Sequence, residues 1–131
     1  RLTDVTGVQT CALPISDLTR VCTDPAMAAS PVALLLGGSG EKMAKLSRRA
    51  SPIFHVSKDD PPFLIMHGDM DDTVPLQQSL AFAKALQESG VAVRLVVLKG
   101  AGHGGSDFFQ PKQIKIIDNF LDENIIRVKT P

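Results

Sequence analysis

The chain has no tryptophan and no tyrosine, and six phenylalanines are its entire aromatic content. Binding sites for single-stranded nucleic acid and for sugars rely on stacking against aromatic rings, so a module built on stacking is not expected. An excess of charge of one sign is also lacking, because 14 lysines and arginines balance 14 aspartates and glutamates. The zero net charge indicates neither a nucleic-acid partner nor another strongly charged one.

Long apolar runs are missing as well. The longest uncharged apolar stretches, such as Val32–Leu36, fall far short of the ~20 residues that a membrane helix needs, so we expect no membrane association. The chain has only two cysteines, Cys11 and Cys22, which match no metal-ligand spacing and can form at most one disulfide. With 131 residues, 44% of them hydrophobic and 21% charged, the composition is that of one globular domain.

The second half of the chain predicts alternating strands and helices. Phe63–Met66 is a short apolar run between turn signals, and Val91–Leu98 is β-branched and leucine-rich, so both are expected to be buried strands. Between them, Leu76–Ser89 predicts a helix with an apolar stripe made of Leu80, Phe82, Ala83 and Leu86. Further helices are predicted at 41–49 and 111–126, and a glycine-rich turn at 37–40. A strand, helix and strand of these lengths form a right-handed βαβ unit with parallel strands, so the fold class is α/β.

The first sixteen residues do not fit this pattern. They show neither helical nor alternating periodicity, and Pro14 interrupts them, which predicts a loop or a frayed end. The segment Val5–Ile15 looks like the translation of a common sequencing-library adapter read in frame. We therefore interpret residues 1–16 as a non-native leader and residues 17–131 as the domain itself, a portion of a longer protein.

Polar residues gather where the two predicted strands end. His67–Thr73, which includes Asp69, Asp71 and Asp72, follows the first strand, and the glycine-rich loop Gly100–Gly105 with His103 follows the second. Because neighbouring parallel strands end at the same edge of a sheet, an aspartate of one loop and His103 of the next are placed to pair. Such a carboxylate–imidazole pair is the acid and base of a nucleophilic triad, and the chain order of acid before histidine fits an α/β-hydrolase.

Metal binding is an alternative for the same aspartates, since Asp69 and Asp71 alternate as the opening ligands of a calcium loop do. The pattern lacks the glycine expected at the sixth loop position, and Leu80 stands where the closing glutamate should be. We therefore expect no metal.

The motifs His67-Gly-x-x-Asp71-x-x-Val-Pro75 and Gly100-x-Gly-His103, with Lys58–Pro62 before the first strand, resemble the C-terminal part of an α/β-hydrolase. The similarity is greatest to the esterase and prolyl-oligopeptidase-like branch, including bifunctional feruloyl and acetyl-xylan esterase-like domains. It implies an incomplete parallel sheet of a three-layer α/β/α sandwich. It also implies that Asp71 is the triad acid and His103 the general base, with no cofactor. His67 is expected to be structural, with its ring hydrogen-bonded near the strand end, and His55 to be a surface or packing residue.

The nucleophile of that family, a serine in a G-x-S-x-G elbow, has no match in the sequence. Ser39 in Gly37–Glu41 comes closest, but Glu41 replaces the last glycine, and we interpret this segment as a turn.

The resemblance therefore implies a serine-type ester hydrolase, present as a fragment that is inactive on its own and acts in the whole protein on a small-molecule or polysaccharide-linked ester. A serine peptidase of the prolyl-oligopeptidase type and a non-catalytic scaffold or interaction domain are the alternatives. An incomplete sheet leaves an exposed edge, so we also expect self-association and marginal stability.

Overall fold

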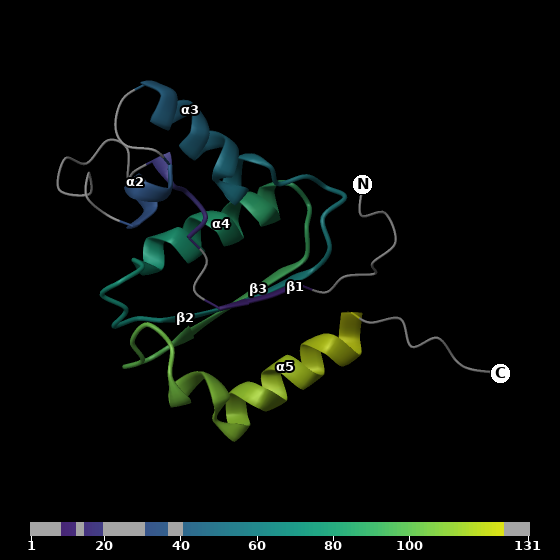
Figure 1. Ribbon diagram of the computed structural model, residues 1–131. Helices are drawn as coiled ribbons and strands as arrows, with labels where there is room; N and C mark the ends of the chain where they lie inside the picture. Colours follow the sequence, from purple (N-terminus) through teal and green to yellow (C-terminus); the bar gives the residue numbers. More distant parts are fainter. Residues whose placement is uncertain (1–8, 13–14, 20–30, 37–40, 125–131) are drawn as a thin grey trace.

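The computed structural model describes residues 9–12, 15–19, 31–36 and 41–124. Three parallel strands form one sheet in the order β1-β2-β3, with bounds β1 Gln9–Ala12, β2 Phe63–Gly68 and β3 Val93–Leu98. The α-helices are α2 Pro31–Leu35, α3 Glu41–Ala50, α4 Leu76–Glu88 and α5 Pro111–Asn124. Figure 1 shows α2, α3 and α4 on one side of the sheet and α5 on the other, so the elements form three layers. The fold class is α/β, as the sequence predicts.

Strand β1 corrects the prediction of a loop or frayed end for the first sixteen residues. Gln9–Ala12 pairs parallel with β2, with Gln9 opposite Phe63 and Ala12 opposite Met66. Parallel pairing uses backbone N–H and C=O groups, which every residue of this segment can supply. A strand of four residues is also too short to produce a readable alternation of apolar and polar residues, so the pattern gave no signal.

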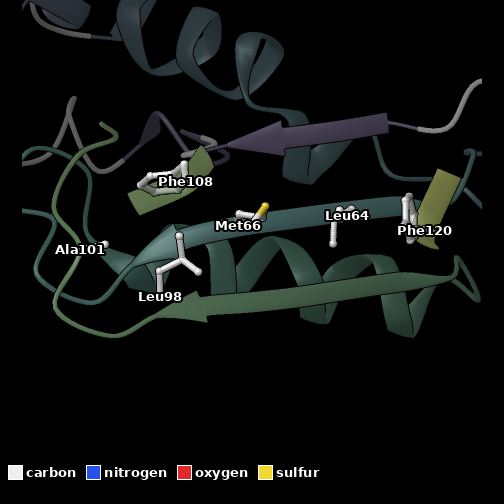
Figure 2. Close-up of a cluster of buried hydrophobic side chains, with 6 residues drawn as sticks. All are labelled: Leu64, Met66, Leu98, Ala101, Phe108 and Phe120. Carbon is white, nitrogen blue, oxygen red and sulfur yellow. The ribbon is translucent and has the colours of Figure 1, made fainter. Parts of the chain in front are cut away.

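Strand β2 is buried on both faces, as predicted, and its side chains alternate between two apolar clusters. Leu64 and Met66 point to the layer that contains α5, where they pack with the residues drawn in Figure 2: Leu98, Ala101, Phe108 and Phe120. Ile65 points to the opposite layer and packs with Phe82, Ala83, Leu86 and Val91 around α4. His67, the next residue but one after Ile65, faces the α4 layer too, and this places its ring against that helix.

Helix α4 lies where the sequence predicts it, but its buried face differs from the predicted stripe. Ala83 and Leu86 are buried, whereas Leu80 is 46% exposed. Phe82 is buried as predicted, and Ser79 completes the buried face in place of Leu80. A serine in this position goes against the apolar pattern, and it is buried because its hydroxyl bonds to His67.

Strand β3 is not the fully buried strand that its composition predicts. Only Leu98 is buried, and Val97 is 41% exposed. Within the described sheet β3 is an edge strand that pairs with β2 alone. The sequence signal of β-branched residues reports strand formation, while burial depends on how many neighbours the strand has.

The remaining helices agree with the prediction in position. Helix α3 ends just before Ser51-Pro52, as the proline rule requires, and α5 begins at Pro111 and is described as far as Asn124. The predicted turn at 37–40, which contains Ser39, lies outside the described residues. Among the helices that the structure describes, none has the length and apolar character needed to cross a membrane.

Residues 15–19 are held against α4 through the side chain of Gln78. Its Oε1 atom accepts hydrogen bonds from the backbone N–H groups of Ser16 and Asp17 at 3.1 and 2.8 Å, and its Nε2 atom donates to the carbonyl of Asp17 at 3.0 Å. Ser16 is fully buried, and its hydroxyl donates to the carbonyl oxygen of Gln78 at 2.8 Å. The chain is therefore fixed to the α4 layer immediately after β1.

Candidate active site

The two polar loops start side by side because β2 and β3 pair without offset at their ends. Gly68, the last residue of β2, lies opposite Leu98, the last residue of β3. The N–H of Asp69 then donates to the carbonyl of Leu98 at 3.1 Å, and the N–H of Met70 donates to the carbonyl of Ala101 at 3.0 Å. The loop after β2 thus runs along the loop after β3 from its first residue, as the sequence analysis expects of neighbouring parallel strands.

Asp71 and His103 meet between these loops. The Nδ1 atom of His103 lies 3.1 Å from Oδ1 and 3.0 Å from Oδ2 of Asp71. The Asp71 side chain is only 1% exposed, whereas that of His103 is 40% exposed. An ionised carboxylate can only accept, so Nδ1 carries the proton of this bond and Nε2 is left with its lone pair. Nothing among the described residues bonds to that Nε2 atom. The pair thus has the tautomer that a general base needs.

The Asp71 carboxylate is held by the backbone of its own loop as well. Oδ1 accepts hydrogen bonds from the N–H groups of Thr73 at 2.9 Å and Val74 at 2.8 Å. Burial acts to raise the pKa of Asp71, but the bonds from Val74, His103 and Thr73 together with the positive charge on protonated His103 bring that pKa below its usual value. The side chain of Asp71 is therefore stabilised in its ionised form, and a carboxylate in this form can stabilise the positive charge of an adjacent imidazolium.

His67 is fully buried and lies against Asp71. Its Nδ1 atom is 2.6 Å from the hydroxyl of Ser79 on α4, and its Nε2 atom is 2.8 Å from the carbonyl oxygen of Val74. The same Nε2 atom lies 3.2 Å from Oδ2 of Asp71. The expectation that His67 is hydrogen-bonded near the strand end is confirmed, and the sequence held no sign that Ser79 is its partner.

The neighbouring aspartates, Asp69 and Asp72, form hydrogen bonds with other partners. Oδ1 of Asp69 accepts the N–H of Gly100 at 2.6 Å and so ties the two loops together, a role that sequence reasoning missed because the residues are far apart in the chain. Asp72 is exposed, and its carboxylate accepts the hydroxyl proton of Thr73 at 3.3 Å. Among the described residues, the His103 imidazole is hydrogen-bonded to Asp71 and to neither of the other two aspartates.

Two positions in and beside these loops require glycine, each for its own reason. Gly104, which follows His103, has φ 96°, a left-handed conformation that side chains disfavour. Gly68 is needed for a different reason, because a Cβ atom there would lie 2.2 Å from the carbonyl oxygen of Ala101 and 2.5 Å from that of Gly102. The loop that presents His103 can therefore rest directly on the end of β2.

The other predicted residues lie away from this pair. His55 is exposed, and its Nε2 atom is bonded to the carbonyl oxygen of Arg49 at 2.8 Å, as expected for a surface residue. Within the described part of the chain, no three histidine, cysteine, aspartate or glutamate side chains come together in a way that could hold a metal ion.

Comparison with known proteins connects this geometry to hydrolases. Esterase LipC of Mycobacterium tuberculosis is 38% identical over 65 residues, which are 49% of this chain and 16% of that protein. A truncated carbohydrate esterase from gut microbiota superposes with a TM-score of 0.77 at 29% identity, covering 89% of this chain and 42% of that one. A thermophilic esterase of Thermogutta terrifontis with bound propionate superposes with a TM-score of 0.65 at 27% identity, covering 88% of this chain and 42% of that chain.

The chain thus spans less than half the length of each of these proteins, and the described sheet and helices are part of an α/β-hydrolase fold, as predicted. The family model described as the prolyl oligopeptidase family matches residues 4–127, nearly the whole chain. On that match, the chain belongs to the prolyl oligopeptidase family of α/β-hydrolases.

Proposed function

We propose that this chain is the C-terminal portion of a serine-type ester hydrolase in which Asp71 is the triad acid and His103 the general base. The observation that carries the proposal is the contact of His103 Nδ1 with both carboxylate oxygens of Asp71, at 3.1 and 3.0 Å. The carboxylate is buried and ionised while the imidazole is partly exposed, so one face of the pair is fixed by the protein and the other is open to a reactant.

In the proposed reaction the free Nε2 atom of His103 takes the proton of a serine hydroxyl supplied by another part of the protein. The serine oxygen attacks the ester carbonyl, and Asp71 stabilises the imidazolium that forms. His103 then returns the proton to the leaving alcohol, and a water molecule activated in the same way hydrolyses the acyl-enzyme. We propose that the 131-residue chain is inactive alone, because its sequence contains no G-x-S-x-G motif.

For the substrate we propose an ester of a small molecule or of a polysaccharide, with acetylated or feruloylated plant polysaccharide as the specific class. The resemblance to feruloyl and acetyl-xylan esterase-like domains supports this class, and so does the similarity to a carbohydrate esterase. The family also contains peptidases, as its name states, so a serine peptidase is the second candidate. A scaffold that has lost catalysis is the third.

The test is to obtain the native coding sequence upstream of Asp17, express the product, and measure hydrolysis of p-nitrophenyl acetate. We expect an upstream G-x-S-x-G motif and a fall in kcat/KM by several orders of magnitude for both His103→Ala and Asp71→Asn. His55→Ala, in an exposed histidine away from the pair, is the matched control and should keep full activity. Full activity in His103→Ala would exclude the proposed base, and the absence of an upstream serine would favour the scaffold. Parallel assays on acetyl-xylan, feruloyl esters and peptide anilides assign the substrate class.

We also propose that residues 1–16 are a non-native leader, with residues 5–15 translated from a sequencing adapter. The proposal rests on the resemblance of Val5–Ile15 to that translation. Strand β1 lies within this segment, but a parallel strand is held by backbone hydrogen bonds that do not depend on side-chain identity. A genomic read across residues 5–15 from a library made with a different adapter decides the matter, since recovery of the same codons would refute the leader.

Finally, we propose that the chain associates with itself through an exposed sheet edge. Within the described sheet β3 pairs on one side only, and its Val97 side chain is 41% exposed. Sedimentation velocity should show a mass that rises with protein concentration. A sharp, reversible and concentration-independent thermal unfolding of a monomer would contradict both this proposal and the expected marginal stability.

A further inference from the structure

The buried ring of His67 connects helix α4 to the loop that carries Asp71. Its Nδ1 atom contacts the Ser79 hydroxyl at 2.6 Å, and its Nε2 atom contacts the Val74 carbonyl at 2.8 Å and Asp71 Oδ2 at 3.2 Å. Ser79 and His67 are both fully buried. Because both ring nitrogens are hydrogen-bonded inside the protein, the two partners fix the orientation of the ring.

The partners determine which nitrogen carries the proton. A carbonyl oxygen can only accept, so the 2.8 Å contact with Val74 requires a proton on Nε2. The Ser79 hydroxyl can donate to the lone pair of Nδ1, which completes the bonding of a ring with a single proton. The Nε2–H group then bonds to the Val74 carbonyl, and Oδ2 of Asp71 lies 3.2 Å from the same nitrogen, in electrostatic contact with it.

Both oxygens of the Asp71 carboxylate are in contact with nitrogen atoms of the protein. Oδ1 accepts the backbone N–H groups of Thr73 and Val74, and Oδ2 lies between His67 Nε2 and His103 Nδ1, at 3.2 and 3.0 Å. Rotation of the carboxylate would break at least one of these contacts. The contact with His67 is the one that is linked to a helix, through Ser79 of α4.

We propose that Ser79 and His67 are positioning residues. The Ser79 hydroxyl selects the Nε2–H tautomer of His67, and this group, through its bond to Val74 and its 3.2 Å contact with Oδ2, holds Asp71 in the orientation that receives His103 Nδ1. The proposal rests on the proposed role of the Asp71 and His103 pair. It predicts that a change at Ser79 on α4, whose hydroxyl bonds to His67, alters the bond between the His103 imidazole and Asp71.

The experiment is ¹⁵N NMR of histidine side chains in the 131-residue chain, which has only three histidines to assign. In the unaltered chain we expect an unprotonated Nδ1 and a protonated Nε2 for His67, and a slowly exchanging Nδ1–H for His103. Ser79→Ala should mix the tautomers of His67 and speed solvent exchange of the His103 Nδ1–H by about fivefold, as expected for loss of one hydrogen bond. Ser89→Ala is the control, because Ser89 ends the same helix through its backbone N–H.

A second pair of variants separates positioning from packing. In His67→Gln the side-chain amide reaches the place of Nε2 and keeps a donor there, so the His103 Nδ1–H signal should persist. In His67→Asn the amide reaches only the place of Nδ1, and we expect that signal to be lost although the core stays folded. The backbone amide spectrum reports folding of each variant. Should both variants unfold, a protonated Nδ1 on His67 in the unaltered chain would overturn the proposal by itself.

Asp71→Ala separates failure of the proposed Asp71 and His103 pair from failure of the proposed positioning role of Ser79 and His67. If the His103 Nδ1–H exchanges equally fast with and without Asp71, the proposed acid–base pair is wrong and this inference falls with it. If Asp71→Ala abolishes the signal while Ser79→Ala and His67→Asn leave it unchanged, the pair stands and only the positioning role is refuted.

Discussion

The Oδ1 atom of Asp69 accepts a hydrogen bond from the backbone N–H of Gly100 at 2.6 Å. This bond joins the start of the loop after β2, which carries Asp71, to the start of the loop after β3, which carries His103. The bond between Asp71 and His103 joins the same two loops further along. One pair of loops thus carries two carboxylate contacts, of which the first supports the geometry of the second.

Asp69→Ala tests this support. Removal of the carboxylate should lower the free energy of unfolding by about 1 kcal/mol, because an exposed carboxylate-to-backbone bond is lost. Amide exchange at Gly100 should become faster, and hydrogen-exchange NMR measures it directly. Asp72→Ala is the control, since that carboxylate bonds only to Thr73 of its own loop. Equal amide exchange rates at Gly100 in the two variants would show that the bond from Asp69 does not hold the two loops together.

Gly68→Ala should be strongly destabilising. The added Cβ atom would lie 2.2 Å from the carbonyl oxygen of Ala101, so backbone has to move, at a cost of about 1–3 kcal/mol or more. Gly102→Ala is the matched control in the opposing loop, where the nearest atom lies at 4.0 Å. Urea denaturation of both variants gives the comparison. A Gly68→Ala protein as stable as Gly102→Ala would mean that the two loops do not rest on each other.

Asp71 should make stability depend on pH in the acid range. Burial opposes ionisation of this carboxyl, but its hydrogen bonds outweigh burial and place its folded-state pKa below the unfolded value of 3.8. Its stabilising contribution is therefore complete above that value and is lost as the pH falls through the folded-state pKa. We expect Asp71→Asn to be less stable than the unaltered chain at neutral pH and to lose less stability on acidification.

Urea unfolding at a series of pH values measures this difference. Asp118→Asn, in an exposed aspartate of α5, is the control and should follow the pH dependence of the unaltered chain. An Asp71→Asn protein with an unchanged acid dependence would show that this carboxyl keeps the same pKa in the folded and unfolded states.

Gln78→Ala should release residues 15–19 from helix α4. The variant loses the acceptor for the Ser16 and Asp17 N–H groups and the donor to the Asp17 carbonyl, so we expect a loss of about 1–3 kcal/mol. Limited proteolysis should then cut near residue 17 faster than in the unaltered chain. Gln77→Ala, at the exposed neighbouring position, should do neither. Unchanged cutting in Gln78→Ala would mean that Ser16 is held by other contacts.

Much of the fold could be predicted because its βαβ unit produces strong local signals. The apolar run at Phe63, the helix before Gly90 and the β-branched run ending at Leu98 all lie where expected. Strand β1 could not be predicted, because a short parallel strand depends on a neighbour distant in the chain. For the same reason the exposed state of β3 could not be read from its residues, since it follows from the order of strands in the sheet.

The candidate site, too, has one contact that could be predicted from the sequence and others that could not. The predicted partners Asp71 and His103 lie at hydrogen-bond distance because a parallel sheet brings neighbouring strand ends together, whichever side chains they carry. The contacts of Ser79 with His67 and of Asp69 with Gly100 depend on side-chain directions that no local pattern encodes. Nothing in the sequence marks Ser79 as the partner of His67, and its place on the buried face of α4 is explained only by the ring opposite.

The matched ends of β2 and β3 have a consequence for how such proteins can be assembled. Asp71 and His103 both lie within one continuous segment, residues 63–103, whose single crossover sets their separation. A recombination breakpoint anywhere before Phe63 would move the two residues together, already within bonding distance. With the roles that we propose for Asp71 and His103, the segment is a transferable half of a catalytic centre, and each combination has to establish anew only the docking of a nucleophile against His103.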